Sequence, residues 1–254
     1  STIATLIEEY NKRSKNIEFY GYLHGYKGLL LGNLLSIPNH RNISELKKYG
    51  GSILGNSRVK LTNIEDCINN KYINKGDNPL EIAANQLKKD CIDILHTIGG
   101  DDTNTTAGEL VKYLSKINYK LIVVGLPKTI DNDVFPIKQT LGAYTAAEQT
   151  SLFFKNIVNE NTTSSRQLII HEVMGRNCGW LTAYSSYLYR ENLKKMKFIP
   201  ELLLNKSKWD IHAIYIPENN FSLDNEVDRL NNIMDKHDCV NIFLSEGAGI
   251  DNIV

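Results

Sequence analysis

Two aspartates lie two residues apart in the segment LPKTIDNDV, which follows an apolar run ending at Gly125. Lys128 and Thr129 come just before Asp131 and Asp133. Neighbouring carboxylates raise each other's pKa, which suits a general base or a metal ligand, and a lysine beside them can hold a phosphate. The same residues also make a good solvated turn, so the motif alone leaves both interpretations open.

A second motif, TIGGDDTNTTAGEL, places glycines and carboxylates where a strand gives way to a helix. Gly99 and Gly100 allow a ligand to approach the backbone, and Thr103 is the expected N-cap of the helix. A helix N-terminus attracts phosphate, whereas the carboxylates of Asp101 and Asp102 repel it, so we expect a bridging Mg²⁺. An ordinary glycine turn capped by aspartates is the alternative.

Two further loops supply cations. In HEVMGRNCGW, Gly175 permits close approach and Arg176 offers a forked donor to a phosphate or sugar oxygen, while Met174 alone is more typical of a core. In GGSILGNSR, Arg58 follows a glycine-rich stretch and can reach a second phosphate, although such a stretch can also be a simple bend. The histidines inside apolar runs are predicted to be core residues or to support a site from behind: His96, His171 and His212.

The elements that must position these loops follow from the spacing of apolar residues. Short, β-branched-rich runs predict strands at 17–22, 91–98, 120–125, 168–174, 212–218 and 240–247. Helical spacing predicts helices at 2–12, 79–90, 103–117, 143–158 and 224–237. Because strand and helix alternate, we predict an α/β, doubly wound fold with mainly parallel sheets, whose ligands bind at the carboxyl ends of the strands.

Composition argues against several classes of protein. Lys+Arg and Asp+Glu both total 29, so the formal net charge of zero gives no general attraction to nucleic acid or to an anionic membrane. The four cysteines are far apart, and no apolar run approaches the roughly 20 residues of a membrane span, which predicts a soluble cytoplasmic protein. No G-x-G-x-x-G follows a strand, which argues against a dinucleotide-binding oxidoreductase.

Taken together, the loops resemble those of the phosphofructokinase family. The motifs GYKGL, GGSILGNSR, GGDDT, PKTIDND, EVMGR, IPE and SEGAG occur in that family's order over nearly the whole chain. The resemblance implies two similar lobes with the active site between them, residues 1–142 for the phosphoryl donor and 143–254 for fructose 6-phosphate. It also implies Mg-dependent phosphoryl transfer to the 1-hydroxyl of fructose 6-phosphate, giving the glycolytic product fructose 1,6-bisphosphate.

The resemblance also implies a role for each loop. Asp131 is the implied base, and Asp101 is the implied ligand of Mg²⁺. The other implied catalytic residues are Thr129, Asp133, Lys128 and Arg176. The sugar phosphate is implied to contact Thr129, Asp131, Met174, Gly175, Arg176, Glu218 and Arg166, the last standing one residue from the arginine that crosses a subunit boundary in the family. The implied donor site comprises Tyr26, Arg58, Gly99, Gly100, Asp101, Asp102 and Thr103.

Two positions bear on the phosphoryl donor. ATP-using members resemble GGDGS and PGTIDND, whereas this chain has Asp102 and Lys128 in place of two glycines, a pattern similar to the pyrophosphate-dependent branch. A carboxylate at Asp102 crowds and repels the α-phosphate of a nucleotide, while Lys128 supplies positive charge for the leaving phosphate. We therefore predict pyrophosphate as co-substrate. An ATP-dependent 6-phosphofructokinase and a non-catalytic regulatory lobe or subunit are the alternatives.

The resemblance further predicts a larger protein. The chain starts at the helix that should follow the family's first strand and glycine-rich loop, and it stops just after SEGAG, so we expect a fragment lacking both that strand and the C-terminal return segment. A sugar site completed across subunits implies a homo- or hetero-oligomer of family subunits. By family analogy, pyrophosphate chemistry runs close to equilibrium, so either direction is open.

Overall fold

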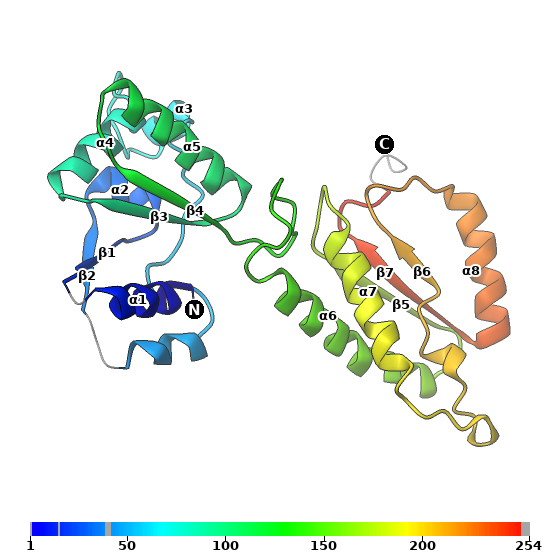
Figure 1. Ribbon diagram of the computed structural model, residues 1–254. Helices are drawn as coiled ribbons and strands as arrows, with labels where there is room; N and C mark the ends of the chain where they lie inside the picture. Colours follow the sequence, from blue (N-terminus) through cyan, green and yellow to red (C-terminus); the bar gives the residue numbers. More distant parts are fainter. Residues whose placement is uncertain (1, 15, 39–41, 250–254) are drawn as a thin grey trace. The chain divides into compact units, whose positions relative to one another are not determined.

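The structure, a computed structural model, describes residues 2–14, 16–38 and 42–249 (Figure 1). The chain divides into two compact units. The first comprises Ser1–Ile98 and Asp102–Gly125, and the second comprises Gly99–Asp101 and Leu126–Val254. The predicted site loops therefore fall in different units. The assignment of residues 1–142 to the donor and of residues 143–254 to the sugar stays a prediction.

The first unit packs helices against short strands. Its elements, two of whose strands run on into the second unit, are α1 (Thr2–Arg13), β1 (Phe19–Tyr22), α2 (Tyr26–Leu31), β2 (Leu34–Ile37), η1 (Ile43–Lys48), α3 (Ile64–Asn69), α4 (Pro79–Lys89), β3 (Ile94–Gly99), α5 (Asp101–Lys116) and β4 (Ile122–Pro127). Leu29, Leu87 and Leu110, from α2, α4 and α5, are fully buried in its core.

Strands β3 and β4 bring two of the predicted loops to one edge. They are neighbours in a sheet. The Ile122 N–H donates to the Asp93 carbonyl at 3.3 Å, and the Lys128 N–H donates to the Gly99 carbonyl at 2.7 Å. Donor and acceptor are separated by the same number of residues in both bonds, so the two strands run parallel. The loops that start at Gly99 and Lys128 therefore leave the sheet side by side.

The second unit is a three-layer structure. Its elements are α6 (Ala143–Ile157), η2 (Val158–Thr162), β5 (Gln167–Val173), α7 (Trp180–Leu193), η3 (Pro200–Leu202), η4 (Lys206–Lys208), β6 (Ala213–Tyr215), α8 (Leu223–His237) and β7 (Cys239–Ser245). The strands pair in parallel in the order β5-β7-β6. Helices α6 and α7 cover one face of the sheet and α8 covers the other (Figure 1). The predicted α/β fold with parallel strands and helices on both faces is confirmed.

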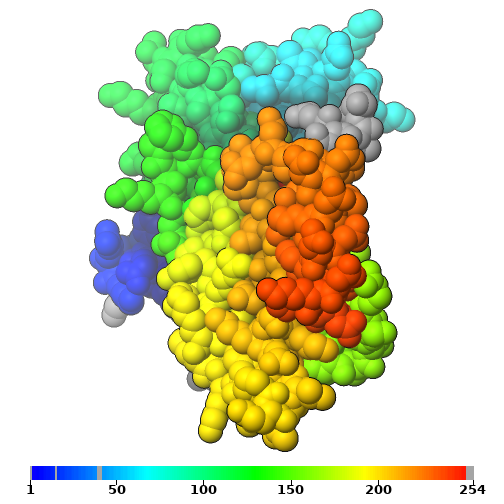
Figure 2. Space-filling model, turned by 90° about the vertical axis from the view of Figure 1, so that its right-hand side faces the viewer, coloured from blue at the N-terminus to red at the C-terminus, as the bar shows by residue number. Residues whose placement is uncertain are grey.

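The sequence of β7 is apolar without alternation because this central strand is covered on both faces. Phe243 packs against Phe154 in the core under α6 and α7, while Ile242 belongs to the core under α8. Successive side chains of a strand point to opposite faces, so a strand covered on both sides must be apolar at nearly every position. Helix α8 itself has no buried residue, and its outer surface faces the viewer in Figure 2.

The structure corrects several local predictions. The strand predicted at 17–22 pairs antiparallel with β2, with Phe19 opposite Ile37, and so forms a hairpin rather than part of a parallel sheet. The predicted N-cap at Thr103 is wrong, because α5 already begins at Asp101. The sequence does not indicate α7, since its apolar residues are spread around the helix and small polar residues are buried with them. Among the described residues, no helix is long and apolar enough to cross a membrane.

Candidate functional site

Asp131 has the environment of a general base. The residue is half-buried, and its Oδ1 has no hydrogen-bond partner among the described residues. Its backbone N–H donates to Thr129 Oγ1 at 3.2 Å. Burial raises the pKa of the Asp131 carboxyl, and repulsion from Asp133, Glu246 and Asp101 raises it further. A raised pKa makes the ionised carboxylate a better proton acceptor than an ordinary surface aspartate.

Glu246 is a site residue that the sequence analysis does not single out. It is exposed just after β7, and its N–H donates to the Val173 carbonyl at the end of β5, at 3.0 Å. Its carboxylate is close enough to Asp131 to raise the pKa of that group. The available signal was its position in SEGAG directly after an apolar run, because parallel strands deliver their following loops to the same edge.

The loop after β5 is held tightly against the loop after β7. Ser245 Oγ donates to the Gly175 carbonyl at 2.6 Å. Gly175 has φ 125°, and a Cβ there would lie 2.3 Å from the Cys178 carbonyl oxygen. A Cβ at Gly247 would lie 1.7 Å from the Arg176 carbonyl oxygen. Only glycine fits at these two positions, so the backbone of Arg176 is fixed while its side chain remains exposed.

Glu218 contacts the start of α7. Its Oε1 accepts a hydrogen bond from the N–H of Gly179, the N-cap residue of this helix, at 2.8 Å. A carboxylate at a helix N-terminus is favoured by the helix dipole and satisfies an otherwise free N–H. Glu218 therefore holds the far end of the loop that contains Arg176, and its direct contact with a sugar phosphate stays a prediction.

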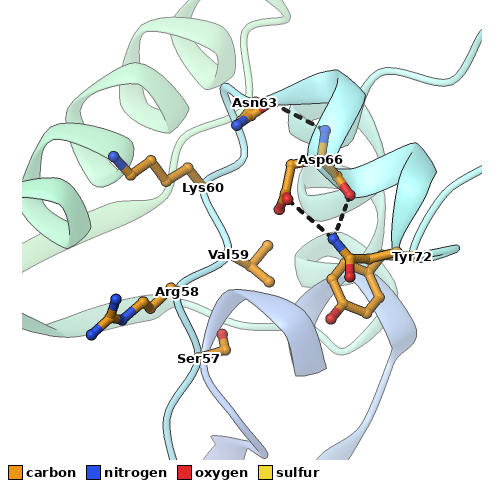
Figure 3. A pocket seen from close by; sticks show the side chains of 8 residues that line it. Ser57, Arg58, Val59, Lys60, Asn63, Asp66 and Tyr72 are labelled. Carbon is orange, nitrogen blue, oxygen red and sulfur yellow. Dashed lines mark hydrogen bonds between the residues drawn. The ribbon is translucent and has the colours of Figure 1, made fainter.

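In the first unit, two cations project from one side of an extended segment. Arg58 and Lys60 point the same way while Val59 points into the core, as alternate residues of an extended chain do (Figure 3). Lys60 Nζ lies 2.7 Å from Asp102 Oδ1. This ion pair compensates the charge of a carboxylate that is predicted to repel a nucleotide. Lys60 was not predicted as a site residue. Its spacing of two residues from Arg58 could have indicated that both side chains lie on the same side of an extended segment.

A pocket of about 320 Å³ lies beside this segment. Its lining side chains are shown in Figure 3 and come from Ser57, Arg58, Val59, Lys60, Asn63, Asp66, Asn70 and Tyr72. Asn63 Oδ1 accepts from the Asp66 N–H at 3.1 Å, and Asn70 Nδ2 donates to the Asp66 carboxylate at 3.1 Å. Asn63, Asp66 and Asn70 thus bond one another, and Arg58 and Lys60 are the two cationic side chains of the lining.

Other predicted donor residues are placed as follows. The Tyr26 hydroxyl donates to the Thr103 carbonyl at 2.9 Å and so ties α2 to α5, and burial raises the pKa of this tyrosine. At Gly100 a Cβ would meet nothing within 4 Å, so the backbone there is open to a ligand. Lys128 is exposed, and its N–H bonds the Gly99 carbonyl.

Arg166 is not brought to the loop after β5 in this chain. It precedes β5, whereas Met174, itself exposed, follows that strand. Its guanidinium pairs with Asp235 at 2.6 Å, and its N–H donates to Asp238 Oδ1 at 2.8 Å. A seven-residue strand separates the two ends. The predicted role of Arg166 at a subunit boundary stays a prediction.

The three histidines within apolar runs are half-buried, and each has one ring nitrogen without a hydrogen-bond partner among the described residues, so their assignment to the core or to the support of a site stays a prediction. Burial lowers the pKa of each: His96, His171 and His212. His96 Nε2 bonds the Tyr10 hydroxyl at 2.9 Å, and His212 Nδ1 accepts from the Asn241 N–H at 2.9 Å. Neutral imidazoles in these positions act in packing and local bonding.

The carboxylates fit Mg²⁺ only in company with a phosphate. Among the described residues, no group of three or more His, Cys, Asp or Glu side chains could hold a metal ion. Asp101 is exposed at the first residue of α5. Mg²⁺ is commonly bound through one or two carboxylates together with substrate phosphates. Asp101 is thus suited to be a single protein ligand for an ion that arrives with the donor.

A family model described as Phosphofructokinase matches residues 2–253. The chain belongs to the phosphofructokinase family. Within that family, it is 54% identical over 256 residues to the pyrophosphate–fructose 6-phosphate 1-phosphotransferase of Methylotuvimicrobium alcaliphilum and 52% identical to that of Methylomonas methanica. Each match covers 100% of this chain and 63% of the relative, so the chain spans less than two thirds of their length.

More distant phosphofructokinases carry a different name. The ATP-dependent 6-phosphofructokinase of Borreliella burgdorferi is 30% identical over 204 residues, which covers 80% of this chain and 40% of that protein. Among solved structures, the pyrophosphate-dependent phosphofructokinase of Nitrosospira multiformis has a TM-score of 0.74 at 22% identity, covering 97% of this chain and 56% of that one. The structural match supports the shared fold.

Proposed function

We propose that this chain is part of an enzyme that transfers a phosphoryl group from pyrophosphate to the 1-hydroxyl of fructose 6-phosphate. The observation that carries the proposal is the half-buried Asp131, whose pKa is raised by burial and by three neighbouring carboxylates. The names of the relatives above 50% identity support both the sugar and the donor. The products are fructose 1,6-bisphosphate and phosphate, and the reaction is reversible.

In this mechanism Asp131 accepts the proton of the 1-hydroxyl as that oxygen attacks the terminal phosphorus of pyrophosphate. Arg176, with its backbone fixed by Gly247, binds the 6-phosphate of the sugar together with the Met174 and Gly175 backbone. Asp101 would hold Mg²⁺ together with the donor, and the ion would supply positive charge to the transferring phosphoryl group. The protein otherwise contributes alignment, because this transfer needs little covalent chemistry from side chains.

The donor preference rests on Asp102 and Lys128. Because Lys60 compensates the charge of Asp102, we assign the disadvantage of ATP mainly to crowding of its α-phosphate by the carboxylate and less to repulsion. Lys60 and Arg58 supply positive charge to pyrophosphate, and Lys128 stabilises the departing phosphate. A cytoplasmic oligomer of family subunits completes the proposal, as predicted from the cysteine usage and the family resemblance.

The test uses the longest natural form of this chain with fructose 6-phosphate and Mg²⁺. Formation of fructose 1,6-bisphosphate is compared with pyrophosphate and with ATP, and Asp131→Asn serves as the control. We expect turnover with pyrophosphate that the substitution abolishes. Turnover with ATP alone would refute the donor assignment. Binding of fructose 6-phosphate without turnover would instead favour a regulatory subunit.

The donor argument has its own test. The double variant Asp102→Gly, Lys128→Gly places glycine at both positions. ATP-using members, whose motifs resemble GGDGS and PGTIDND, have glycine there. We expect it to gain ATP-dependent formation of fructose 1,6-bisphosphate. A folded double variant without any ATP-dependent rate would show that other residues choose the donor.

A further inference from the structure

One buried residue bonds groups on both sides of Asp131. Thr140 is 1% exposed and lies at the far end of the loop that follows β4. Its Oγ1 donates to the Thr129 carbonyl at 2.7 Å, and its N–H donates to Asn132 Oδ1 at 2.8 Å. The backbone of Asp131 is therefore anchored two residues before it and one residue after it.

Asn132 completes this clamp. It has φ 57°, a left-handed conformation that asparagine adopts more readily than most residues. Its Nδ2 donates to the Lys138 carbonyl at 3.3 Å, so its side chain spans the loop. The Leu141 N–H donates to the Pro127 carbonyl at 2.9 Å and closes the base of the loop. Such compact loops with closed ends hold their shape through internal contacts.

The carboxylate of Asp131 depends on this backbone support. Its Oδ1 has no hydrogen-bond partner within the described residues, so that oxygen does not anchor the side chain. The Asp131 N–H bonds Thr129 Oγ1, and the Thr129 carbonyl in turn accepts from Thr140. The position of the carboxylate is thereby tied to a hydroxyl nine residues further along the chain.

We propose that Thr140 and Asn132 are positioning residues that aim the Asp131 carboxylate at the hydroxyl it deprotonates. The proposal rests on the proposed function for its reaction, and its geometry rests on the loop alone. A clamp of this kind acts on the chemical step more than on sugar binding, because it braces the residue that takes the proton, whereas Arg176 and the backbone of Met174 and Gly175, which are proposed to bind the sugar phosphate, lie in another loop. A misplacement of about 1 Å costs on the order of a hundredfold in rate.

The test is Thr140→Val in the full-length protein, which removes the hydroxyl and keeps the shape. We expect kcat to fall by about 10- to 100-fold, with the KM for fructose 6-phosphate and for pyrophosphate changed less than about threefold. Thr140→Ser keeps the hydroxyl and should restore kcat. Asn132→Gly, which tolerates the positive φ without strain, removes the other half of the clamp and should also lower kcat.

The matched control is Thr182→Val. Thr182 is 0% exposed on α7, and its hydroxyl has no partner among the described residues, so this change removes a buried hydroxyl without removing a bond. Hydrogen exchange of the peptide covering the TIDND motif should accelerate in Thr140→Val and not in Thr182→Val. In a wild type that turns over, an unchanged kcat in Thr140→Val would overturn the proposal, as would a loss that Thr140→Ser fails to restore.

The exchange measurement also separates this proposal from the assigned reaction. If the wild type fails with pyrophosphate, the proposed function is wrong, yet faster exchange in Thr140→Val still supports the clamp. If the wild type turns over and the variants match it in kcat, the clamp is wrong and the proposed function stands.

Discussion

Replacing Gly247 by alanine should separate the fold from the sugar site. A Cβ at this position would lie 1.7 Å from the carbonyl oxygen, 2.5 Å from the carbonyl carbon and 2.9 Å from the Cα of Arg176. Real Cβ contacts do not fall below 3.0 Å, so the Arg176 backbone must move by about 1.3 Å, the difference between 3.0 and 1.7 Å. The obstacle is backbone, which cannot turn aside as the end of a flexible side chain can.

This displacement acts directly on the proposed sugar phosphate site. The loop is also tied at Gly175 by Ser245, so Arg176 cannot shift without straining that bond. Since a misplacement of about 1 Å costs on the order of a hundredfold, kcat/KM for fructose 6-phosphate should fall by about that factor. Most of the loss should come from a higher KM for fructose 6-phosphate, while the KM for pyrophosphate changes little.

The matched control is Gly108→Ala. Gly108 lies inside α5, where a Cβ would meet nothing within 4 Å, so alanine should stabilise the helix by about 0.5–1 kcal/mol. Steady-state kinetics at saturating pyrophosphate, together with urea unfolding, would measure both effects. A Gly247→Ala protein with kcat/KM within threefold of the wild type would refute the close-approach argument.

Three further changes test other parts of the structure. Phe154 is 0% exposed, so Phe154→Ala should lower the free energy of unfolding by about 3–5 kcal/mol. Its neighbour Phe153 is 61% exposed, so Phe153→Ala should lower it by less than about 0.5 kcal/mol. Equal losses in urea unfolding would contradict this packing. Burial, then the carboxylates of Asp133, Glu246 and Asp101, raise the pKa of Asp131, so activity should fall as pH drops through that raised value. Because the folded protein holds this proton more tightly than the unfolded chain, the same group lowers stability as pH rises from the ordinary aspartate range through the raised value. Glu246→Gln removes one repelling charge and should move the acidic limb of kcat/KM to lower pH; an unmoved limb would show that Glu246 does not act on Asp131. Lys60→Met removes a charge-assisted contact and should raise the KM for pyrophosphate by about tenfold, whereas Lys112→Met, which breaks the Lys112–Glu109 pair on α5, should leave it unchanged.

The sequence by itself determined the elements with a strong period and the loops that follow them. The apolar runs that became β3, β4, β5 and β7 are short and closed by glycine, proline or charge, so their ends, and with them the TIDND and MGR loops, could be located within about two or three residues. The order of the motifs also indicated the family. These features are local, because the hydrophobic period of a segment and the residues that end it can be read from neighbouring positions of the sequence.

Only the tertiary structure decided which distant residues meet. Glu246 lies at the end of β5 because β7 is the neighbour of β5 in the order β5-β7-β6, an order that apolar spacing does not encode, and from there its charge acts on Asp131. Lys60 pairs with Asp102, and Glu218 holds the start of α7, through contacts that span about forty residues of sequence. Helix α7 could not be predicted from its sequence, because its buried residues do not form an amphipathic pattern and the neighbouring elements bury it. Such contacts depend on the packing of whole elements, so no single segment carries the information that creates them.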